Sequence, residues 1–260
     1  MKAIVYTQYG SPEVLKVENI PKPVPDKDQV LIKVHATTVT AGDWRMRKPD
    51  PQAARLYNGL FRPKKVNVLG FEVAGVIEDV GNQVTRFKGG EEVYAYTGLK
   101  FGGYAEYVCL PEEGDEKKGL VALKPLNLSF EEAAAVPTGA LAALNMLRMG
   151  GIKKDQNVLV IGASGSVGTY AIQLARYFGA IVDGVSSARN QELVRSLGAA
   201  NGYDYSREDY LSGEVQYDLI FDAAGKLMSG ITKNEAKKAL RPDGVFVSVE
   251  MSRKDTVEDL

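Results

Sequence analysis

The sequence has very few of the side chains that bind transition metals or form cross-links. Its 260 residues include one cysteine, Cys109, and one histidine, His35. A single cysteine cannot form a disulfide within the chain, and it cannot build a cysteine-rich zinc site. So little cysteine is typical of a protein from a reducing compartment.

The sequence also lacks a long apolar run and an excess of one charge. No stretch approaches the ~20 apolar residues that cross a bilayer, and residues 1–7 lack the apolar core of a signal peptide. The 32 basic and 33 acidic side chains give a net charge of −1, so no basic excess indicates nucleic acid or an anionic membrane. We therefore predict a cytoplasmic protein with a small-molecule partner, and neither nucleic acid nor membrane among its partners.

Glycine is the residue in excess. The chain has 27 glycines, while its 45% hydrophobic and 25% charged residues are ordinary for a globular protein. This composition excludes a largely disordered chain, and it indicates several turns or close backbone approaches.

The first half of the chain predicts short strands separated by glycine and proline. Strands are expected at residues 2–7, 14–18, 30–39, 73–80, 92–96 and 104–110, with a short helix at 43–48. Many short strands with turn signals between them are typical of a barrel or a rolled sheet. Residues 111–125, bounded by two prolines, predict a linker or crossover.

The second half predicts alternating strands and helices. Ser129 and Glu132 have the spacing of a capping box, and Pro137 is expected to end the helix that they begin. The expected helices are 140–149, 167–178, 191–197 and 234–240, and the expected strands are 158–161, 181–185, 218–221 and 244–249. Such alternation predicts a parallel sheet, hence an α/β protein.

The strongest motif is the glycine loop at residues 162–168. It has glycine at Gly162, Gly165 and Gly168, follows an apolar strand and begins a long helix. In this context the glycines permit a tight turn, close approach of a pyrophosphate, and close helix–strand packing. The helix start adds unpaired N–H groups for the phosphates. The alternative interpretation is a glycine-rich turn with no ligand.

The end of the second strand indicates which dinucleotide binds. A site for NAD places a carboxylate about 20 residues after the loop, but here Ser186 stands at that position. Arg189 follows and can pair with a 2′-phosphate, whereas Asp183 lies mid-strand. The residues predict NADP(H) rather than NAD(H). The alternative is that Arg189 is only a surface residue at the start of the next helix and binds no phosphate.

No catalytic side chain stands out. The Tyr-x-x-x-Lys spacing used by short-chain dehydrogenases occurs at Tyr96 and Lys100, upstream of the glycine loop. His35 lies in a strand-like run, where a structural position is the simpler interpretation. We therefore expect the cofactor to supply the chemistry as hydride transfer, while the protein supplies position and electrostatics.

Several short motifs, taken in order, resemble the medium-chain dehydrogenase/reductase superfamily, and within it the zinc-free quinone oxidoreductase (zeta-crystallin-like) branch. They lie at residues 1–6, 40–45, 69–75, 80–81, 103–107, 136–139, 162–168 and 222–225. The resemblance implies a GroES-like β-barrel catalytic domain over residues 1–122 and a Rossmann NADP-binding domain over residues 123–260. Zinc-dependent relatives have cysteine near Ala41 and histidine where Phe71 stands, so the resemblance implies no metal.

The resemblance also implies site residues. Those for the pyrophosphate are Gly162, Ser164, Gly165, Ser166, Val167 and Gly168; those for the 2′-phosphate and adenosine ribose are Ser186, Arg189 and Tyr205. Those on the nicotinamide side are Thr138, Ala223, Gly225 and Val247, and those on the substrate side are Asp43, Trp44, Tyr57 and Phe61. The alternatives are that Trp44 is a packing residue and that Asp43 caps its own helix. No proton donor is identified.

The implied activity is hydride transfer from NADPH to a quinone or an activated alkene or enone. The alternative is a protein that binds NADPH without turnover, as a sensor, a structural protein or a truncated remnant. Family members continue past residues 244–249 with another strand and a return segment, whereas this sequence ends at Leu260 after a polar run. We therefore expect a truncated Rossmann sheet with an exposed edge, and a homodimer as one way to cover it.

Overall fold

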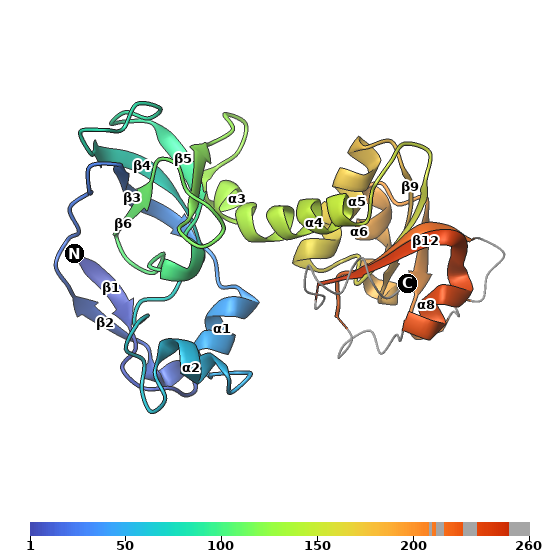
Figure 1. The fold of residues 1–260 in the computed structure, drawn as a ribbon, viewed down its shortest axis with the longest axis horizontal. Helices are drawn as coiled ribbons and strands as arrows, with labels where there is room; N and C mark the ends of the chain where they lie inside the picture. The colour runs from blue at the N-terminus through green and yellow to red at the C-terminus, as the bar shows by residue number, and fades with distance from the viewer. Residues whose placement is uncertain (208–209, 212–215, 226–232, 250–260) are drawn as a thin grey trace. The chain divides into compact units, whose positions relative to one another are not determined.

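The chain forms two compact units, Met1–Thr138 and Gly139–Leu260 (Figure 1). The structure, a computed structural model, describes residues 1–207, 210–211, 216–225 and 233–249. Within these residues, no helix has both the length and the apolar character that crossing a membrane requires. The predicted domain limit at residues 122 and 123 stays a prediction.

The first unit is built on an antiparallel sheet with the strand order β6-β3-β4-β5-β7. Its edge strands β6 and β7 contact each other, so the sheet curls towards closure as the predicted barrel requires. The five strands are β3 (Gln29–Thr37), β4 (Glu72–Val80), β5 (Glu92–Tyr96), β6 (Tyr107–Pro111) and β7 (Leu120–Leu123). A hairpin of β1 (Lys2–Val5) and β2 (Lys16–Asn19) is bridged to the rest at Ala3–Ala105 and Val5–Val68.

Short helices cover parts of this unit. α1 begins where Thr40 and Asp43 form a capping box, and α3 begins where Ser129 and Glu132 form the predicted one. The inward faces of α1 and α2 pack on a cluster that includes Tyr6, Leu69 and Phe101. The helices are α1 (Ala41–Arg47), α2 (Ala54–Asn58), α3 (Phe130–Ala134) and the single 3-10 turns η1 (Pro12–Val14) and η2 (Gly98–Lys100).

The second unit is built on a parallel sheet with the strand order β10-β9-β8-β11-β12. By position along the chain this order is 3-2-1-4-5, which is the Rossmann order, so the predicted parallel α/β fold is confirmed. The strands are β8 (Asn157–Ile161), β9 (Ile181–Ser186), β10 (Asn201–Asp204), β11 (Tyr217–Asp222) and β12 (Leu240–Ser248). The helices are α4 (Pro137–Met149), α5 (Ser166–Tyr177), η3 (Ala188–Asn190), α6 (Gln191–Ser196) and α8 (Lys233–Ala239).

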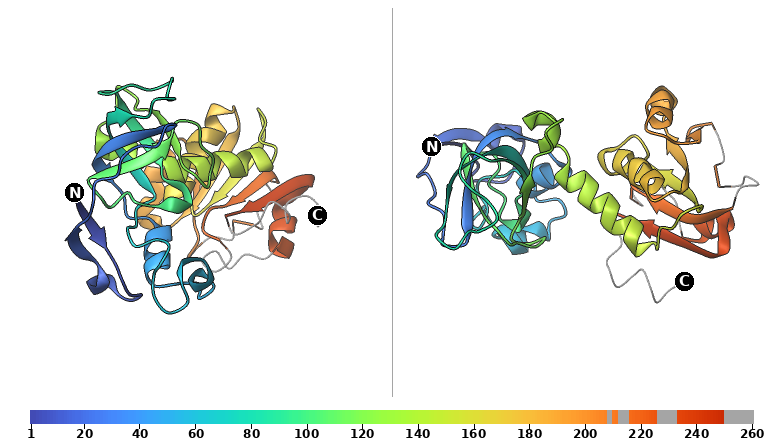
Figure 2. Two further views of the ribbon diagram at one scale, coloured as in Figure 1. Left: turned by 60° about the vertical axis from the view of Figure 1, so that its left-hand side comes forward. Right: turned by 90° about the horizontal axis from the view of Figure 1, so that it is seen from above.

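Both faces of this parallel sheet are covered, which explains its continuous apolar strands. Val158 and Val160 of β8 face a core shared with α4, α5 and α6, whereas Leu159 and Ile161 face the core shared with α8. The two views of Figure 2 show α5 and α8 on opposite sides of the sheet. α4, α5 and α6 therefore cover one face of the sheet, and α8 covers the other.

Some predicted elements were wrong in their limits. α3 ends at Ala134, before Pro137 as predicted. Pro137 also begins α4, three residues before the predicted start at residue 140, because proline fits the first helical turn, where no N–H is needed. The predicted linker at residues 111–125 contains β7, which pairs with β5. The sequence analysis missed α2 and β10, which have five and four residues and too little periodicity to detect. β12 starts at Leu240, before the predicted position 244; the polar run after Met251 lies outside the described residues.

Candidate cofactor and substrate site

The glycine loop joins β8 to α5, and two of its glycines are required by close packing. Gly162 has φ +73°, and a Cβ there would lie 3.0 Å from the backbone nitrogen of Ala224. A Cβ on Gly168 would overlap the carbonyl oxygen of Gly162. No other residue therefore fits these two positions without moving the loop.

The third glycine faces solvent. Gly165 is exposed, and the nearest atom to a Cβ there is the Gly162 carbonyl oxygen at 3.3 Å. Gly165 is the N-cap of α5 and provides no side-chain cap. In the described part of the chain, the N–H groups of Ser166, Val167 and Gly168 have no hydrogen-bond partner. An open glycine beside unpaired N–H groups is a surface that fits a pyrophosphate.

The loop after the neighbouring strand β11 completes this edge of the sheet. The buried Asp222 carboxylate accepts hydrogen bonds from Ala224 N at 3.1 Å and Gly225 N at 3.0 Å. Ala223 N donates to the Ile161 carbonyl at 2.9 Å. Asp222 thus holds the predicted residues Ala223 and Gly225 beside the glycine loop. Ligands of open α/β sheets bind where neighbouring strands send their chains to opposite faces, as β8 and β11 do here.

The predicted adenosine side lies at the same edge, at the ends of β9 and β10. Tyr205 follows β10, is exposed, and donates its N–H to the Ser186 carbonyl at 3.3 Å. Ser186 is buried, and its hydroxyl accepts a hydrogen bond from Gln191 Nε2 at 3.1 Å. The structure therefore brings Ser186 and Tyr205 together, although Ser186 is already engaged with Gln191.

The charges at this position match the prediction of a 2′-phosphate site. Arg189 lies in η3, is exposed, and has no ion pair or hydrogen bond from its guanidinium in the described part of the chain. Asp183 is buried, where it accepts hydrogen bonds from Asn201 N at 3.1 Å and from the Tyr217 hydroxyl at 3.0 Å. Burial raises the pKa of Tyr217, and the Asp183 charge raises it further. The carboxylate of Asp183 is thus unavailable to a ribose, and Arg189 is available to an anion.

The sequence analysis missed a residue that links the adenosine side to the glycine loop. Asn190 Nδ2 donates to the Ser164 hydroxyl at 2.9 Å. Asn190 immediately follows Arg189 in η3. The sequence shows only that an asparagine follows Arg189. The spacing of residues does not indicate that its amide donates to Ser164.

Two further predicted cofactor residues have buried side-chain atoms. Val247 lies near the carboxyl end of β12, in register with Phe221 of β11, and its side chain is fully buried in the core of the second unit. Thr138 N donates to Glu72 Oε1 at 2.5 Å, and the buried Thr138 hydroxyl has no hydrogen-bond partner among the described residues. Glu72 is itself buried and also accepts from the Thr38 hydroxyl. Glu72, which the sequence analysis missed as a site residue, thus fixes the start of α4.

Asp43, predicted on the substrate side, is used by the fold. It is 1% exposed, and Oδ2 accepts from both N and Oγ1 of Thr40 at 2.8 Å. Oδ1 accepts from Gly70 N at 2.8 Å. Burial raises the pKa of Tyr104, and the charge of Asp43 adds to that shift. The capping alternative for Asp43 is therefore what the structure shows, and contact with a substrate stays a prediction.

The aromatic residues of this region are partly exposed. Trp44 is 39% exposed and Phe61 is 86% exposed, while the Tyr57 hydroxyl donates to the Leu99 carbonyl at 2.8 Å. Phe71 stacks on Tyr96 and contacts Phe101, with ring centroids 5.9 and 4.1 Å apart. Apolar rings are thus available to a flat ligand, and the assignment of Trp44, Tyr57 and Phe61 to a substrate stays a prediction.

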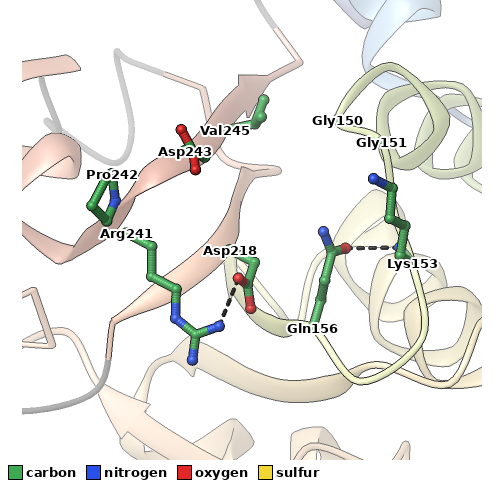
Figure 3. Close-up of a pocket in the computed structure, with 9 residues that line it drawn as sticks. All are labelled: Gly150, Gly151, Lys153, Gln156, Asp218, Arg241, Pro242, Asp243 and Val245. Atoms are coloured by element: carbon green, nitrogen blue, oxygen red, sulfur yellow. Dashed lines mark hydrogen bonds and ion pairs between the residues drawn. The ribbon is translucent and has the colours of Figure 1, made fainter.

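A separate pocket of about 380 Å³ lies at the opposite edge of the parallel sheet, where the strands begin (Figure 3). Arg241 Nη1 pairs there with Asp218 Oδ1 at 2.8 Å, and Lys153 N donates to Gln156 Oε1 at 2.7 Å. Because ligands of such sheets bind at the carboxyl ends of the strands, this pocket is not the dinucleotide site. Among the described residues, no group of three or more His, Cys, Asp and Glu side chains is arranged to hold a metal ion.

The strand order and the glycine loop define a protein of the dinucleotide-binding α/β class. Comparisons with known proteins narrow this class. The family described as "Alcohol dehydrogenase GroES-like domain" matches residues 26–118, and the family described as "Zinc-binding dehydrogenase" matches residues 166–260. The chain belongs to the medium-chain dehydrogenase/reductase superfamily, and the resemblance to its quinone oxidoreductase branch is confirmed.

Individual relatives support this placement. A 2-methylene-furan-3-one reductase of Solanum lycopersicum is 40% identical over 239 residues, which cover 87% of this chain and 58% of that protein. An NADPH-dependent alkenal/one oxidoreductase of Arabidopsis thaliana is 36% identical, with 96% of this chain and 62% of that protein covered. The quinone oxidoreductase of Coxiella burnetii superposes with a TM-score of 0.81 at 34% identity, covering 95% of this chain and 75% of that one. The chain thus spans about three fifths of the length of the two plant relatives.

Proposed function

We propose that this chain binds NADPH and takes part in the reduction of quinones or of activated alkenes and enones. The observation that carries the proposal is the edge of the parallel sheet where Gly165, the unpaired N–H groups of α5 and Arg189 lie. The names of the relatives support the acceptor class, because they are an alkenal/one oxidoreductase, a furanone reductase and a quinone oxidoreductase.

The residues present fit a phosphorylated dinucleotide. Ser164, Gly165, Ser166, Val167 and Gly168 would hold the pyrophosphate, with the N–H groups of Ser166, Val167 and Gly168 lacking partners in the described part of the chain and Gly165 leaving room for the phosphates. The exposed Arg189 would pair with the 2′-phosphate. Ser186 and Tyr205 would lie at the adenosine ribose, with Asp183 already engaged by Asn201 and Tyr217.

The chemistry then divides between cofactor and protein. When bound, NADPH supplies a hydride to an electron-poor carbon of the acceptor. Ala223 and Gly225, held by Asp222, would form one wall beside the nicotinamide. Thr138, whose buried hydroxyl has no hydrogen-bond partner among the residues that the structure describes, would also lie near the nicotinamide. The substrate side would comprise Trp44, Tyr57 and Phe61, with Asp43 acting through the position of α1 and Gly70.

We further propose that the reaction needs no metal. Phe71, which stands where zinc-dependent relatives have histidine, packs its ring on Tyr96 and Phe101. A Cβ on Gly42 would overlap that ring, so the backbone of α1 approaches Phe71 closely. The position is thus filled by an apolar ring that cannot coordinate a cation. Metal analysis of the active protein is expected to find no stoichiometric zinc.

We also propose a cytoplasmic location, which is supported by the low cysteine content, a single residue in the sequence. A homodimer stays a prediction.

The test measures cofactor binding and turnover separately on the full chain. NADPH and NADH affinities are measured by nicotinamide fluorescence, and turnover by loss of reduced-nicotinamide absorbance with a benzoquinone, a naphthoquinone and a vinyl ketone. A saturated ketone is the matched negative control. We expect NADPH to bind more tightly than NADH, and a quinone or the vinyl ketone to be reduced. Binding without turnover on any acceptor would favour the non-enzymatic alternative, and reduction of the saturated ketone would refute the acceptor class.

A further inference from the structure

Charge is distributed very unevenly in the first unit. Residues 44–65 contain seven cationic side chains and one acidic side chain, Asp50, in a chain whose total net charge is −1. The seven are Arg45, Arg47, Lys48, Arg55, Arg62, Lys64 and Lys65. We call residues 44–65 the basic segment; it comprises most of α1, all of α2 and the residues that flank α2.

Carboxylates do not neutralise this segment. In the described part of the chain, none of its seven cations lies within 4.0 Å of a carboxylate oxygen. Asp43, just before the segment, is buried and holds Thr40 and Gly70. The pKa of Glu13 is lowered mainly by a hydrogen bond from Ser11, and the charge of Arg47 makes the smallest contribution to this shift. Five of the seven cations are exposed, so most of this positive charge faces solvent without a carboxylate partner: Arg45, Lys48, Arg62, Lys64 and Lys65. Arg47 and Arg55 are half-buried, and Nε of Arg47 is buried.

Large apolar side chains are exposed on the same segment. Leu56 is 83%, Leu60 56% and Phe61 86% exposed. Scattered single exposures of this kind are ordinary, but three within six residues form a patch. The cations also lie near rings: Lys65 Nζ is 3.9 Å from the centroid of Tyr57, and the Arg45 guanidinium carbon is 5.5 Å from that of Trp44.

The fold turns these groups outward on one side of the unit. Met46 of α1 and Tyr57 of α2 both pack inward on the cluster around Tyr6, Leu69 and Phe101. Figures 1 and 2 show α1 and α2 near each other at the same end of the unit. Because both helices lie on one core cluster, their opposite sides face away from it together. The exposed side chains of α1 and α2 therefore lie on the outer sides of two neighbouring helices. We call the exposed cations and apolar side chains of the basic segment the basic face.

We propose that this basic face docks on an anionic lipid bilayer surface. Leu56 and Leu60 would enter the boundary between headgroups and acyl chains, and the exposed cations would lie at the anionic headgroups. Nucleic acid is the weaker match, because exposed leucines have no partner among phosphates and base edges. The proposal goes beyond hydride transfer and does not depend on it, although quinones with long apolar chains reside in bilayers.

Co-sedimentation of the full chain with vesicles tests this proposal. One set of vesicles contains phosphatidylcholine alone, and the other contains one part phosphatidylglycerol to two parts phosphatidylcholine. We expect binding to the anionic vesicles only, with affinity that falls as sodium chloride is added. Equal binding to both sets, or to neither, overturns the proposal. Tighter binding to single-stranded DNA than to the anionic vesicles assigns the face to nucleic acid and also overturns it.

Two matched pairs of variants locate the surface. Arg62→Glu with Lys64→Glu is expected to weaken vesicle binding roughly 25-fold or more, at about fivefold per charge removed. Lys117→Glu with Lys118→Glu makes the same charge change on exposed lysines outside the segment, and is expected to have much less effect. Similar losses in both pairs would show that net charge alone acts, and would refute a defined face.

The apolar contribution is tested in the same way. Leu56→Ser is expected to weaken binding roughly tenfold, whereas Leu126→Ser, at a position 99% exposed outside the segment, is expected to change it little. No difference between these two variants would remove the apolar part of the proposal. Circular dichroism and NADPH affinity of each variant check that the chain is folded, so failure of vesicle binding and failure of the proposed enzyme activity remain distinguishable.

Discussion

The two units of this protein differ in which atoms they leave free for a ligand. At the candidate site of the second unit, the groups left free among the described residues are backbone N–H groups at the start of α5 and the exposed guanidinium of Arg189. In the first unit, the buried carboxylates that resemble catalytic groups are already engaged: Asp43 holds Thr40 and Gly70, and Glu72 holds Thr38 and Thr138. The spacing of glycines in the sequence is thus enough to identify a binding site made of backbone N–H groups. A site made of side chains is harder to identify, because the sequence does not show which hydrogen-bond partners already engage each side chain.

The largest expected effect follows from filling the open glycine of the second unit. Gly165→Val is expected to weaken both NADPH and NADH about a thousandfold, or ~4 kcal/mol, because a side chain takes the place of the pyrophosphate. Its stability should change little, since Gly165 has φ −79° and its Cβ would have one close neighbour, at 3.3 Å. Fluorescence titration with each cofactor measures the loss.

Gly168→Ala is the matched control in the same loop. Its Cβ would overlap the Gly162 carbonyl oxygen, so we expect a loss of about 2 kcal/mol in the free energy of unfolding from overpacking. If Gly165→Val destabilised the fold as much as Gly168→Ala while binding stayed normal, the loop would be structural only.

The second prediction concerns the engaged carboxylate of the first unit. Asp43→Ala is expected to lower the free energy of unfolding by about 3 kcal/mol, because it removes the capping box and leaves the Gly70 N–H unpaired. Asp43→Asn, which keeps one acceptor oxygen, should lose about half as much. Urea denaturation gives both values. Normal stability with lost turnover in both variants would instead assign Asp43 to the substrate.

The third prediction addresses cofactor choice. Arg189→Ala is expected to weaken NADPH roughly 30-fold, or ~2 kcal/mol, by removing a charge-assisted contact to the 2′-phosphate. NADH affinity should stay unchanged. Arg195→Ala, at an exposed arginine of α6, is the matched control. An equal loss for both cofactors would show that Arg189 does not recognise the extra phosphate.

The second unit was largely predictable from the sequence because its periodicity is strong. Strands buried on both faces give continuous apolar runs, and β8, β9 and β11 lie within one residue of their predicted limits. The glycine loop was predictable because each glycine has a separate steric reason, two of which the structure shows directly. Short elements such as α2 and β10 carry too few residues for a pattern.

The candidate site was less predictable because its contacts join distant residues. Glu72 and Thr138 are 66 positions apart, and Asn190 and Ser164 are 26 apart. Only the folded chain brings such pairs together. The net charge of −1 likewise did not indicate the basic segment, because it sums over the whole chain, where acidic residues elsewhere offset the seven cations of residues 44–65.

The smallest expected effect tests whether any side chain contributes to the backbone site of the second unit. Asn190 donates to the Ser164 hydroxyl at 2.9 Å, so it connects the segment of Arg189 to the glycine loop. Asn190→Ala is expected to weaken NADPH and NADH equally, about fivefold or ~1 kcal/mol, which is the usual net value of one hydrogen bond. Fluorescence titration of both cofactors measures the change, with Ser164→Ala and the double variant completing a cycle. A loss confined to NADPH would show that Asn190 acts by positioning Arg189; an additive cycle would show that the hydrogen bond does not contribute, and the second unit would then hold the pyrophosphate by backbone alone.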